Sequence, residues 1–322
     1  MYDDDLPPFL DRAWPLGTVL SATQPTTGTM HQTFLLQTTC GPFVLRGYRH
    51  LTRARVAREH ALIRFAAAHG LPAPVPIQRE DGSALWEQEG RFYALFPMAL
   101  GRQVPRAALG ARESAAMGTF LGRLHRVLQD YPRDHVEARS FTADLPTTVA
   151  RIAYLEQVIR EWPQQSEIEE RALRRLAERR AWLAGTAGDM PTVADIPVQV
   201  IHGDYQETNL FFSGGQVSAI IDWDQAYAAP RTWEVLRVFH LVFQFAPAPS
   251  RAFLRAYQRV LPLSSAHLRA TAACYCHLRT HDLWVYEATY LAGNDRTRAF
   301  IHDGPFTPLD QRWAQLQATL FT

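Results

Sequence analysis

The stretch VIHGDYQETN, residues 200–209, and the stretch IIDWD, residues 220–224, decide how this chain is interpreted. Asp204 is followed five residues later by Asn209 and eighteen residues later by Asp222. Transfer of a phosphoryl group from ATP needs one carboxylate beside the acceptor hydroxyl and oxygen ligands that hold Mg²⁺ on the phosphates. The spacing assigns Asp204 to the first task, and Asn209 and Asp222 to the second.

The residues around this motif predict strands. Residues 198–201 predict a strand leading into the loop, and residues 210–212 and 217–221 predict a hairpin around the turn SGGQ, 213–216. Because a hairpin folds back on itself, Asn209 at its start and Asp222 at its end are expected to lie close together. The alternative is a plain turn with Asp204 as its cap, which accounts for His-Gly-Asp but not for Asn209 and Asp222.

Length and composition describe an ordinary soluble protein. A chain of 322 residues, 47% hydrophobic and 20% charged, is long enough for two lobes. The formal net charge of +1 argues against nucleic acid or an anionic membrane as a partner. No apolar run is long enough to span a membrane, the acidic start is unlike a signal peptide, and three cysteines (Cys40, Cys274 and Cys276) make no disulfide framework. The expected location is the cytoplasm.

The chain contains no lysine, so all 33 Lys-or-Arg positions are arginine. A phosphate loop of the Walker A type requires a lysine, and so does a Schiff-base enzyme, so both classes are excluded. A kinase built from this sequence must therefore use an arginine as its phosphate-binding cation.

The first hundred residues predict a small sheet with one helix. Residues 34–38 and 43–46 predict a hairpin, and residues 91–97 a further strand. Residues 53–69 predict a helix on which Glu59 lies in the buried stripe. A carboxylate on a buried stripe requires a cation, and Arg46 on the preceding strand is the candidate. Residues 98–105 predict a crossing between lobes.

The remainder predicts helices, over residues 113–129, 148–159, 166–183, 232–244, 250–260, 265–291 and 308–320. The charged face of 166–183 is expected to be solvated. The expected fold is α+β with two lobes: a small antiparallel-sheet lobe with one helix over residues 1–97, and a larger, mainly helical lobe over residues 98–322.

With these residues in place, the chain resembles the aminoglycoside phosphotransferase and choline kinase-like family, which includes homoserine kinase-like enzymes and has the protein-kinase-like fold. The resemblance extends from about residue 20 to about residue 240 and rests on the His-Gly-Asp loop with Asn209 and on Asp222. Further similarities are GLPAPVP at 70–76 and LGRLH at 121–125. Arg46 and Glu59 fall where the family has a Lys and a Glu, so Arg46 departs from the pattern.

The resemblance implies an ATP- and Mg²⁺-dependent kinase that acts on a hydroxyl of a small molecule: an amino alcohol, amino acid, sugar or aminoglycoside. The base of ATP would lie against residues 96–100, including Met98, and its phosphates near Arg46 and the loop around Gly28. Asp204 would accept the hydroxyl proton. His202 is expected to support the loop by hydrogen bonding. Asp224 could either support the metal site from behind its ligands or act as a simple cap, and the cap is favoured.

Two other classes remain open. One is a nucleotide-binding pseudokinase with a regulatory role, because Arg46 replaces the lysine. The other is a metal-dependent hydrolase that uses the Asp and Asn cluster. Two further sets are weaker candidates: Cys274, His277 and His281 share a helix face that suits packing better than metal binding, and residues 282–290 mix carboxylates with aromatics that could hold a cationic substrate.

Overall fold

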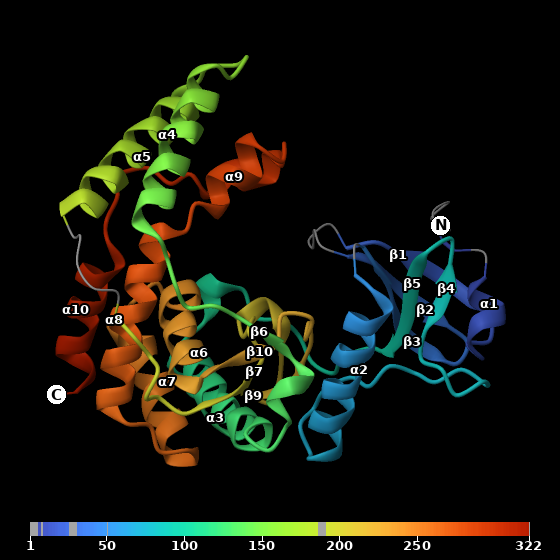
Figure 1. Ribbon diagram of the computed structural model, residues 1–322. Helices are drawn as coiled ribbons and strands as arrows, with labels where there is room; N and C mark the ends of the chain where they lie inside the picture. Colours follow the sequence, from blue (N-terminus) through green and yellow to red (C-terminus); the bar gives the residue numbers. More distant parts are fainter. Residues whose placement is uncertain (1–5, 8, 26–30, 50, 186–190, 322) are drawn as a thin grey trace. The chain divides into compact units, whose positions relative to one another are not determined.

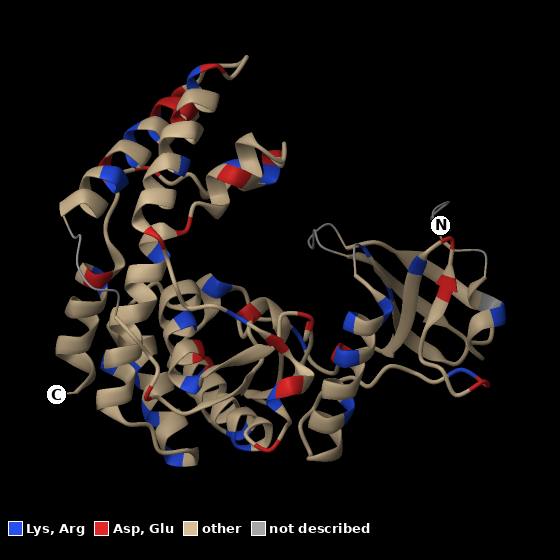
Figure 2. Ribbon diagram, in the orientation of Figure 1, with Lys and Arg blue, Asp and Glu red and all other residues tan. Residues whose placement is uncertain are grey.

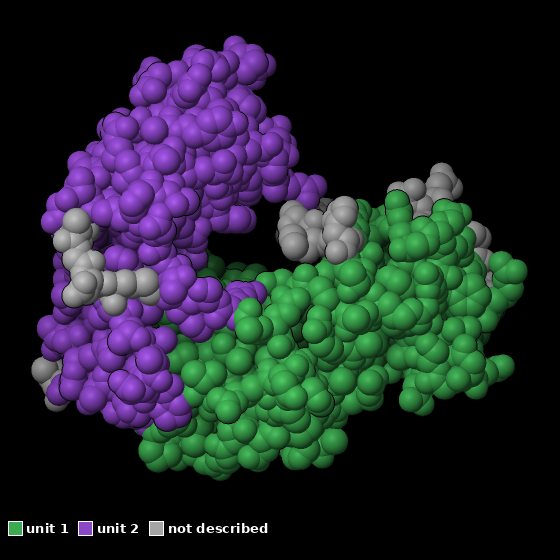
Figure 3. All heavy atoms as spheres, in the orientation of Figure 1, with its two compact units in different colours: residues 1–138, 198–243, 248–262 green, residues 139–197, 244–247, 263–322 purple. Residues whose placement is uncertain are grey.

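The computed structural model describes residues 6–7, 9–25, 31–49, 51–185 and 191–321 (Figure 1). The chain forms two compact units (Figure 3). The first contains residues 1–138, 198–243 and 248–262, and the second contains residues 139–197, 244–247 and 263–322. None of the helices in the described ranges is long and apolar enough to cross a membrane.

The first unit opens with a five-stranded antiparallel sheet in the order β1-β2-β3-β5-β4. Its strands are Val19–Thr23, Gln32–Thr38, Gly41–Tyr48, Trp86–Gln88 and Arg91–Pro97, for β1 to β5. The predicted hairpin, β2 and β3, and the predicted strand β5 are confirmed; β1 and β4 were not predicted. Short helix α1, Leu10–Ala13, supplies buried apolar side chains to one face of the sheet, where Phe9 and Trp14 pack with Phe34, Leu45 and Leu95.

Helix α2, Arg53–Ala68, lies beside this sheet as predicted (Figure 1). Thr52 caps its start by accepting a hydrogen bond from the N–H of Arg55 at 3.3 Å. The stripe that contains Glu59 is buried, as expected from its spacing. The helix gives way to Gly70, whose φ of +77° suits a residue without Cβ.

The segment that carries the predicted site residues forms two small sheets packed against helices. Strands β6 (Glu137–Ala138), β10 (Tyr227–Pro230) and β7 (Val198–Ile201) make one sheet, and the predicted hairpin of β8 (Leu210–Ser213) and β9 (Gln216–Ile220) makes the other. Three single-turn helices are η1 (Arg106–Ala108), η2 (Arg133–His135) and η3 (Glu207–Asn209). Helix α3, Ala111–Leu128, approaches α7, Pro247–Val260, so closely that a Cβ on Gly118 would lie 2.1 Å from the carbonyl oxygen of Phe253.

The helix predicted over residues 232–244 has two parts. Helix α6, Arg231–Arg237, continues into a single π-helical turn, η4, Val238–Val242. The apolar spacing predicted a helix but carried no signal for the change in winding.

The second unit is helical. Helices α4 (Leu145–Arg160) and α5 (Glu167–Gly185) pack together, and charged residues line both (Figures 1 and 2). The remaining elements are α8 (Ser265–His281), α9 (Trp284–Tyr290), η5 (Asp295–Phe300) and α10 (Leu309–Leu320). The unit's apolar core includes Leu155, Leu176, Tyr286 and Tyr290.

The single helix predicted over residues 265–291 is wrong. The backbone becomes extended at Asp282, which separates α8 from α9. The Asp282 carboxylate accepts a hydrogen bond from the N–H of Trp284 at 2.9 Å, a local bond that competes with helix continuation.

The α+β class is confirmed by the sheet and the helical segments. The predicted lobe boundary after residue 97 falls at the end of β5 and stays a prediction.

The buried histidine of α2 generates a prediction about acid sensitivity. Burial, with Arg64 and Arg46 nearby, lowers the pKa of His60 from 6.5 to about 3, and Tyr48 Oη lies 3.0 Å from its Nε2. A lowered pKa in the folded state contributes stability above pH 6.5 that is lost as the pH falls toward 3. Between pH 7 and pH 5 the wild type should lose about 2 kcal/mol more unfolding free energy than His60→Gln, measured by urea denaturation. Parallel losses in both proteins would contradict the assignment.

Candidate active site

The loop after β7 holds the Asp204 side chain through one of its carboxylate oxygens, Oδ2. Asp204 Oδ2 accepts hydrogen bonds from Asn209 Nδ2 at 2.8 Å and from Gln206 Nε2 at 2.9 Å. Asn209 Nδ2 also donates to the Asp204 carbonyl at 2.9 Å. The amide nitrogen of Asn209 is therefore committed to Asp204, and its Oδ1 is the side-chain atom suited to bind a cation.

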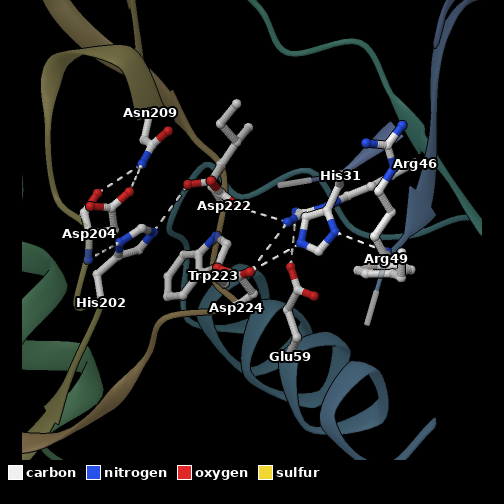
Figure 4. A network of polar contacts seen from close by, with 12 residues as sticks. His31, Arg46, Arg49, Glu59, His202, Asp204, Asn209, Asp222, Trp223 and Asp224 are labelled. Carbon is white, nitrogen blue, oxygen red and sulfur yellow. Dashed lines mark hydrogen bonds and ion pairs between the residues drawn. The ribbon is translucent and has the colours of Figure 1, made fainter. Parts of the chain in front are cut away.

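His202 connects this loop to the hairpin (Figure 4). Its side chain is fully buried; Nδ1 accepts the N–H of Asp204 at 3.3 Å, and Nε2 donates to the carbonyl of Ile221 at 3.1 Å. These bonds support the predicted role of His202 in positioning the loop. Gly203 has a φ of +82°, and a Cβ there would lie 2.0 Å from the carbonyl oxygen of Gln225, so this turn requires glycine.

A buried carboxylate on α6 braces the same loop. Glu234 accepts hydrogen bonds from the N–H of His202 at 3.2 Å and of Gly203 at 2.6 Å, and its third partner is His125 Nε2 at 2.9 Å. Burial alone would raise the pKa of Glu234, but the hydrogen bond from His125 and the other polar partners outweigh it and lower the pKa. The loop is therefore anchored by an ionised carboxylate.

The hairpin brings the two predicted cation ligands together. Asn209 lies just before β8 and Asp222 just after β9, and the N–H of Ile221 donates to the carbonyl of Asn209 at 3.0 Å. Asp222 has a φ of +67°, in the left-handed region that Asp tolerates better than most residues. Its side chain is 37% exposed.

Arg46 connects the sheet, α2 and the hairpin (Figure 4). Its guanidinium donates to Glu59 Oε1 at 3.1 Å and to Asp222 Oδ1 at 2.7 Å, and Asp224 Oδ2 lies 3.9 Å away. Burial alone would lower the pKa of Arg46, but Glu59 and the other anions outweigh it and raise the pKa. Burial raises the pKa of Glu59 to about 7, against the opposing effect of Arg46. The predicted Arg46–Glu59 pair is present.

The sequence did not reveal His31 as part of this network. His31 Nε2 lies 3.1 Å from Asp224 Oδ2, and its Nδ1 accepts the N–H of Arg49 at 3.3 Å. Burial alone would raise the pKa of Asp224, but the hydrogen bond from His31 and the charge of Arg46 outweigh it and lower the pKa. Asp224 is thus a partner of His31 and Arg46, and not the simple cap expected. A lone histidine outside any motif carries no signal for this role.

The donor set near Asp222 suits Mg²⁺. Asn209 Oδ1 and the Asp222 carboxylate are hard oxygen ligands, and Mg²⁺ in kinases is held by one or two such groups together with substrate phosphates. Within the described ranges, no three His, Cys, Asp or Glu side chains gather as a metal site. Asn209 Oδ1 and the Asp222 carboxylate could therefore hold such an ion together with phosphate oxygens.

Gly28 and Met98 are two further residues predicted to lie near the nucleotide. Gly28 lies outside the described residues. Met98 is half-buried just after β5, with its N–H 3.4 Å from the carbonyl oxygen of Pro42. The segment that follows is fixed to the catalytic hairpin, because Arg102 and Phe212 exchange backbone hydrogen bonds of 3.0 and 2.8 Å.

The other candidate sets lie in the second unit. Cys274 is buried in α8, and His281 Nδ1 bonds with Thr148 Oγ1 at 2.8 Å. Tyr286 and Tyr290 belong to the apolar core, and Glu287 pairs with Arg151 at 2.7 Å. Packing and ion pairing thus account for most of these side chains.

Comparison with known proteins gives consistent matches. Residues 21–273 match the model of the phosphotransferase enzyme family. The chain is 32% identical over 276 residues to a homoserine kinase of Bradyrhizobium diazoefficiens, covering 82% of this chain and 77% of that protein. Among solved structures it resembles a spectinomycin phosphotransferase in complex with ADP and spectinomycin, with a TM-score of 0.69 at 13% identity over 96% and 92% of the two chains. An aminoglycoside phosphotransferase from Alicyclobacillus acidocaldarius gives a TM-score of 0.64 at 13% identity over 99% and 95%.

A sheet lobe in which a helix carboxylate pairs with a strand cation, followed by a hairpin among helices, is the protein-kinase-like fold of the solved structures that this chain resembles. The chain belongs to the phosphotransferase enzyme family, and it is a small-molecule kinase. The resemblance inferred from the His-Gly-Asp loop is confirmed.

The brace on the loop can be tested with Glu234→Gln. A glutamine keeps one acceptor oxygen, but its NH₂ faces an N–H that the carboxylate formerly accepted. The variant should lose about 2–4 kcal/mol of unfolding free energy and most of its transfer activity. Chemical denaturation and turnover measure the two effects. Tyr257→Phe is the control, because it removes only the hydroxyl bonded to His125 at 2.8 Å and should cost less than about 1.5 kcal/mol. Equal effects of both variants would argue against the brace.

Proposed function

We propose that this chain transfers the γ-phosphate of ATP to a hydroxyl group of a small molecule, with Asp204 as the base. The observation that carries the proposal is the single polar network that joins Asp204, Asn209, Asp222 and Arg46 (Figure 4). The network supports the proposal because it holds together two carboxylates, an amide oxygen and a guanidinium, which are the kinds of group that phosphoryl transfer requires.

Each residue has a distinct task in this mechanism. Asp204 orients the acceptor hydroxyl and takes its proton, while Asn209 Nδ2 fixes the carboxylate at 2.8 Å. Asn209 Oδ1 and Asp222 would hold Mg²⁺, which supplies charge neutralisation on the phosphate oxygens. Arg46 binds phosphate oxygens through the guanidinium fork that now contacts Glu59 and Asp222. His202 keeps the loop in register with the hairpin. Met98 stays a prediction for the nucleotide side, and so does Gly28, which lies outside the described residues.

L-homoserine is the first acceptor to examine, because relatives with about a third of residues identical are homoserine kinases. The solved structures of antibiotic phosphotransferases are only 13% identical in sequence to this chain, so they support its fold and not its acceptor. Amino alcohols, sugars and aminoglycosides therefore remain acceptor classes for the same experiment.

A nucleotide-binding pseudokinase is the second candidate. The observation that favours it is the 2.7 Å contact of Arg46 with Asp222 Oδ1, because this ion pair uses an oxygen that would otherwise face a metal ion. A nucleotide that cannot displace Arg46 from Asp222 would bind without transfer.

The base is tested by ATP turnover with Mg²⁺ over a panel of acceptors that includes L-homoserine, choline, ethanolamine, methylthioribose and aminoglycosides. Asp204→Asn should reduce acceptor-dependent turnover by about 10²–10⁴-fold, because it removes the proton acceptor and keeps the side-chain shape. Asp130→Asn, at an exposed site at the end of α3, is the matched control and should behave as the wild type. Full activity of Asp204→Asn would remove Asp204 from the mechanism.

The arginine is tested with two substitutions. Arg46→Lys keeps the charge as a compact ammonium, so ADP binding by calorimetry and turnover should stay within about tenfold of the wild type. Arg46→Gln removes the charge and leaves Glu59 buried without its cation, so turnover should fall by about 100-fold or more. A turnover that appears only in Arg46→Lys would identify the wild type as the pseudokinase.

A further inference from the structure

A second cation lies beside the proposed base. Arg237, at the end of α6, places its Nη2 3.4 Å from Asp204 Oδ1, with side chains 18% and 23% exposed, respectively. The other oxygen, Oδ2, faces Asn209 and Gln206. The carboxylate therefore has one side turned to the cation ligand Asn209 and another side turned to Arg237.

The position of Arg237 follows from the brace. Glu234 lies one turn earlier on α6 and is fixed to the N–H groups of His202 and Gly203. Residues three apart on a helix share a face, so the same helix side that holds the loop backbone delivers Arg237 to the Asp204 carboxylate. The winding changes to a π-helix immediately after Arg237, a local feature that occurs frequently at functional sites.

Arginine at this point selects the charge of what binds beside Asp204. The acceptor hydroxyl must approach Asp204, so the rest of the acceptor lies near the guanidinium. The guanidinium has only donors and offers a cationic group of the acceptor no attractive contact, whereas a carboxylate would be held by the fork geometry that arginine offers to oxyanions. The five N–H donors of a guanidinium allow contacts with Asp204 and a second anion together.

We propose that Arg237 binds a carboxylate of the acceptor, so that the substrates of this kinase are small hydroxy acids, of which hydroxy amino acids are the simplest class. The proposal rests on the proposed function, because it needs the acceptor hydroxyl at Asp204. With Arg237 Nη2 3.4 Å from Asp204 Oδ1, the hydroxyl and the carboxylate bind close together. That geometry suits a compact acceptor of about three to five carbons, given ordinary hydrogen-bond lengths.

Matched acceptor pairs test this selectivity. L-homoserine and 3-aminopropan-1-ol differ only in the carboxylate, and so do L-serine and ethanolamine. Steady-state kinetics at saturating ATP should show that the wild type prefers the carboxylated member of a pair. In Arg237→Gln, kcat/KM for that member should fall by about 10–100-fold, mainly through KM, while the value for its partner changes less than about twofold. Arg237→Lys should restore part of the preference.

The control is Arg231→Gln, which removes the same charge from the start of the same helix, where Arg231 Nη2 donates to the carbonyl of Pro262 at 2.5 Å. This variant should keep the wild-type preference. Thermal unfolding of all variants separates loss of folding from loss of selectivity, and Arg237→Lys preserves the test if Arg237→Gln does not fold.

The other outcomes of these experiments either support or overturn the proposed role of Arg237. Equal losses on both members of a pair would place Arg237 on the transferred phosphoryl group and overturn the proposal. Transfer to aminoglycosides or amino alcohols without preference for a carboxylate would also overturn it and leave the proposed function standing.

If no acceptor is phosphorylated, the proposed function fails, and calorimetric binding of L-homoserine and 3-aminopropan-1-ol then decides the role of Arg237. Carboxylate-dependent binding that Arg237→Gln abolishes supports that role, and its absence rejects it.

Discussion

The site depends on one buried carboxylate. Glu234 accepts hydrogen bonds from two successive backbone N–H groups of the catalytic loop and from His125, and the surrounding protein excludes water from it. An ionised group in such surroundings is stable only when its partners are fixed in place. Because these partners are fixed, the loop that carries Asp204 is held in position and α6 is oriented. The next turn of α6 then brings Arg237 to the Asp204 carboxylate. One interaction thereby arranges both the proposed base and its neighbouring cation.

The absence of lysine shapes the other side of the site. A lysine could contact one or two anions at a point, whereas the planar guanidinium of Arg46 reaches Glu59 on α2 and Asp222 beyond β9 together, with Asp224 nearby. The sheet, the helix and the catalytic hairpin are thus joined through one side chain. His31 adds a further connection by holding Asp224. The arginine is more than a replacement charge, because its shape makes it a link between three elements.

The sequence predicted the parts of the site that lie on regular elements. The hairpin period placed Asn209 beside Asp222, and the helical stripe placed Glu59 opposite Arg46; both follow from short-range geometry, and the structure agrees. It did not predict His31 with Asp224 or Glu234 with the loop, because these contacts join residues far apart in the chain and follow no spacing rule. The break at Asp282 was not predicted, because helical periodicity assumes that every N–H bonds to a backbone carbonyl. The N–H of Trp284 bonds to the Asp282 side chain instead. The surroundings of Gly28 stay a prediction.

The left-handed backbone at Asp222 has a consequence for how this gene can change. Asn and Gly are the residues that share this conformation with Asp most readily. In the genetic code, each of them is separated from Asp by a single nucleotide. The replacements that the backbone accepts with least strain are thus also the most accessible ones, and both remove the negative charge at that position. With Asp222 as the proposed Mg²⁺ ligand, a folded descendant without transfer activity is expected one nucleotide away, and selection for activity, more than selection for folding, is then what favours aspartate there.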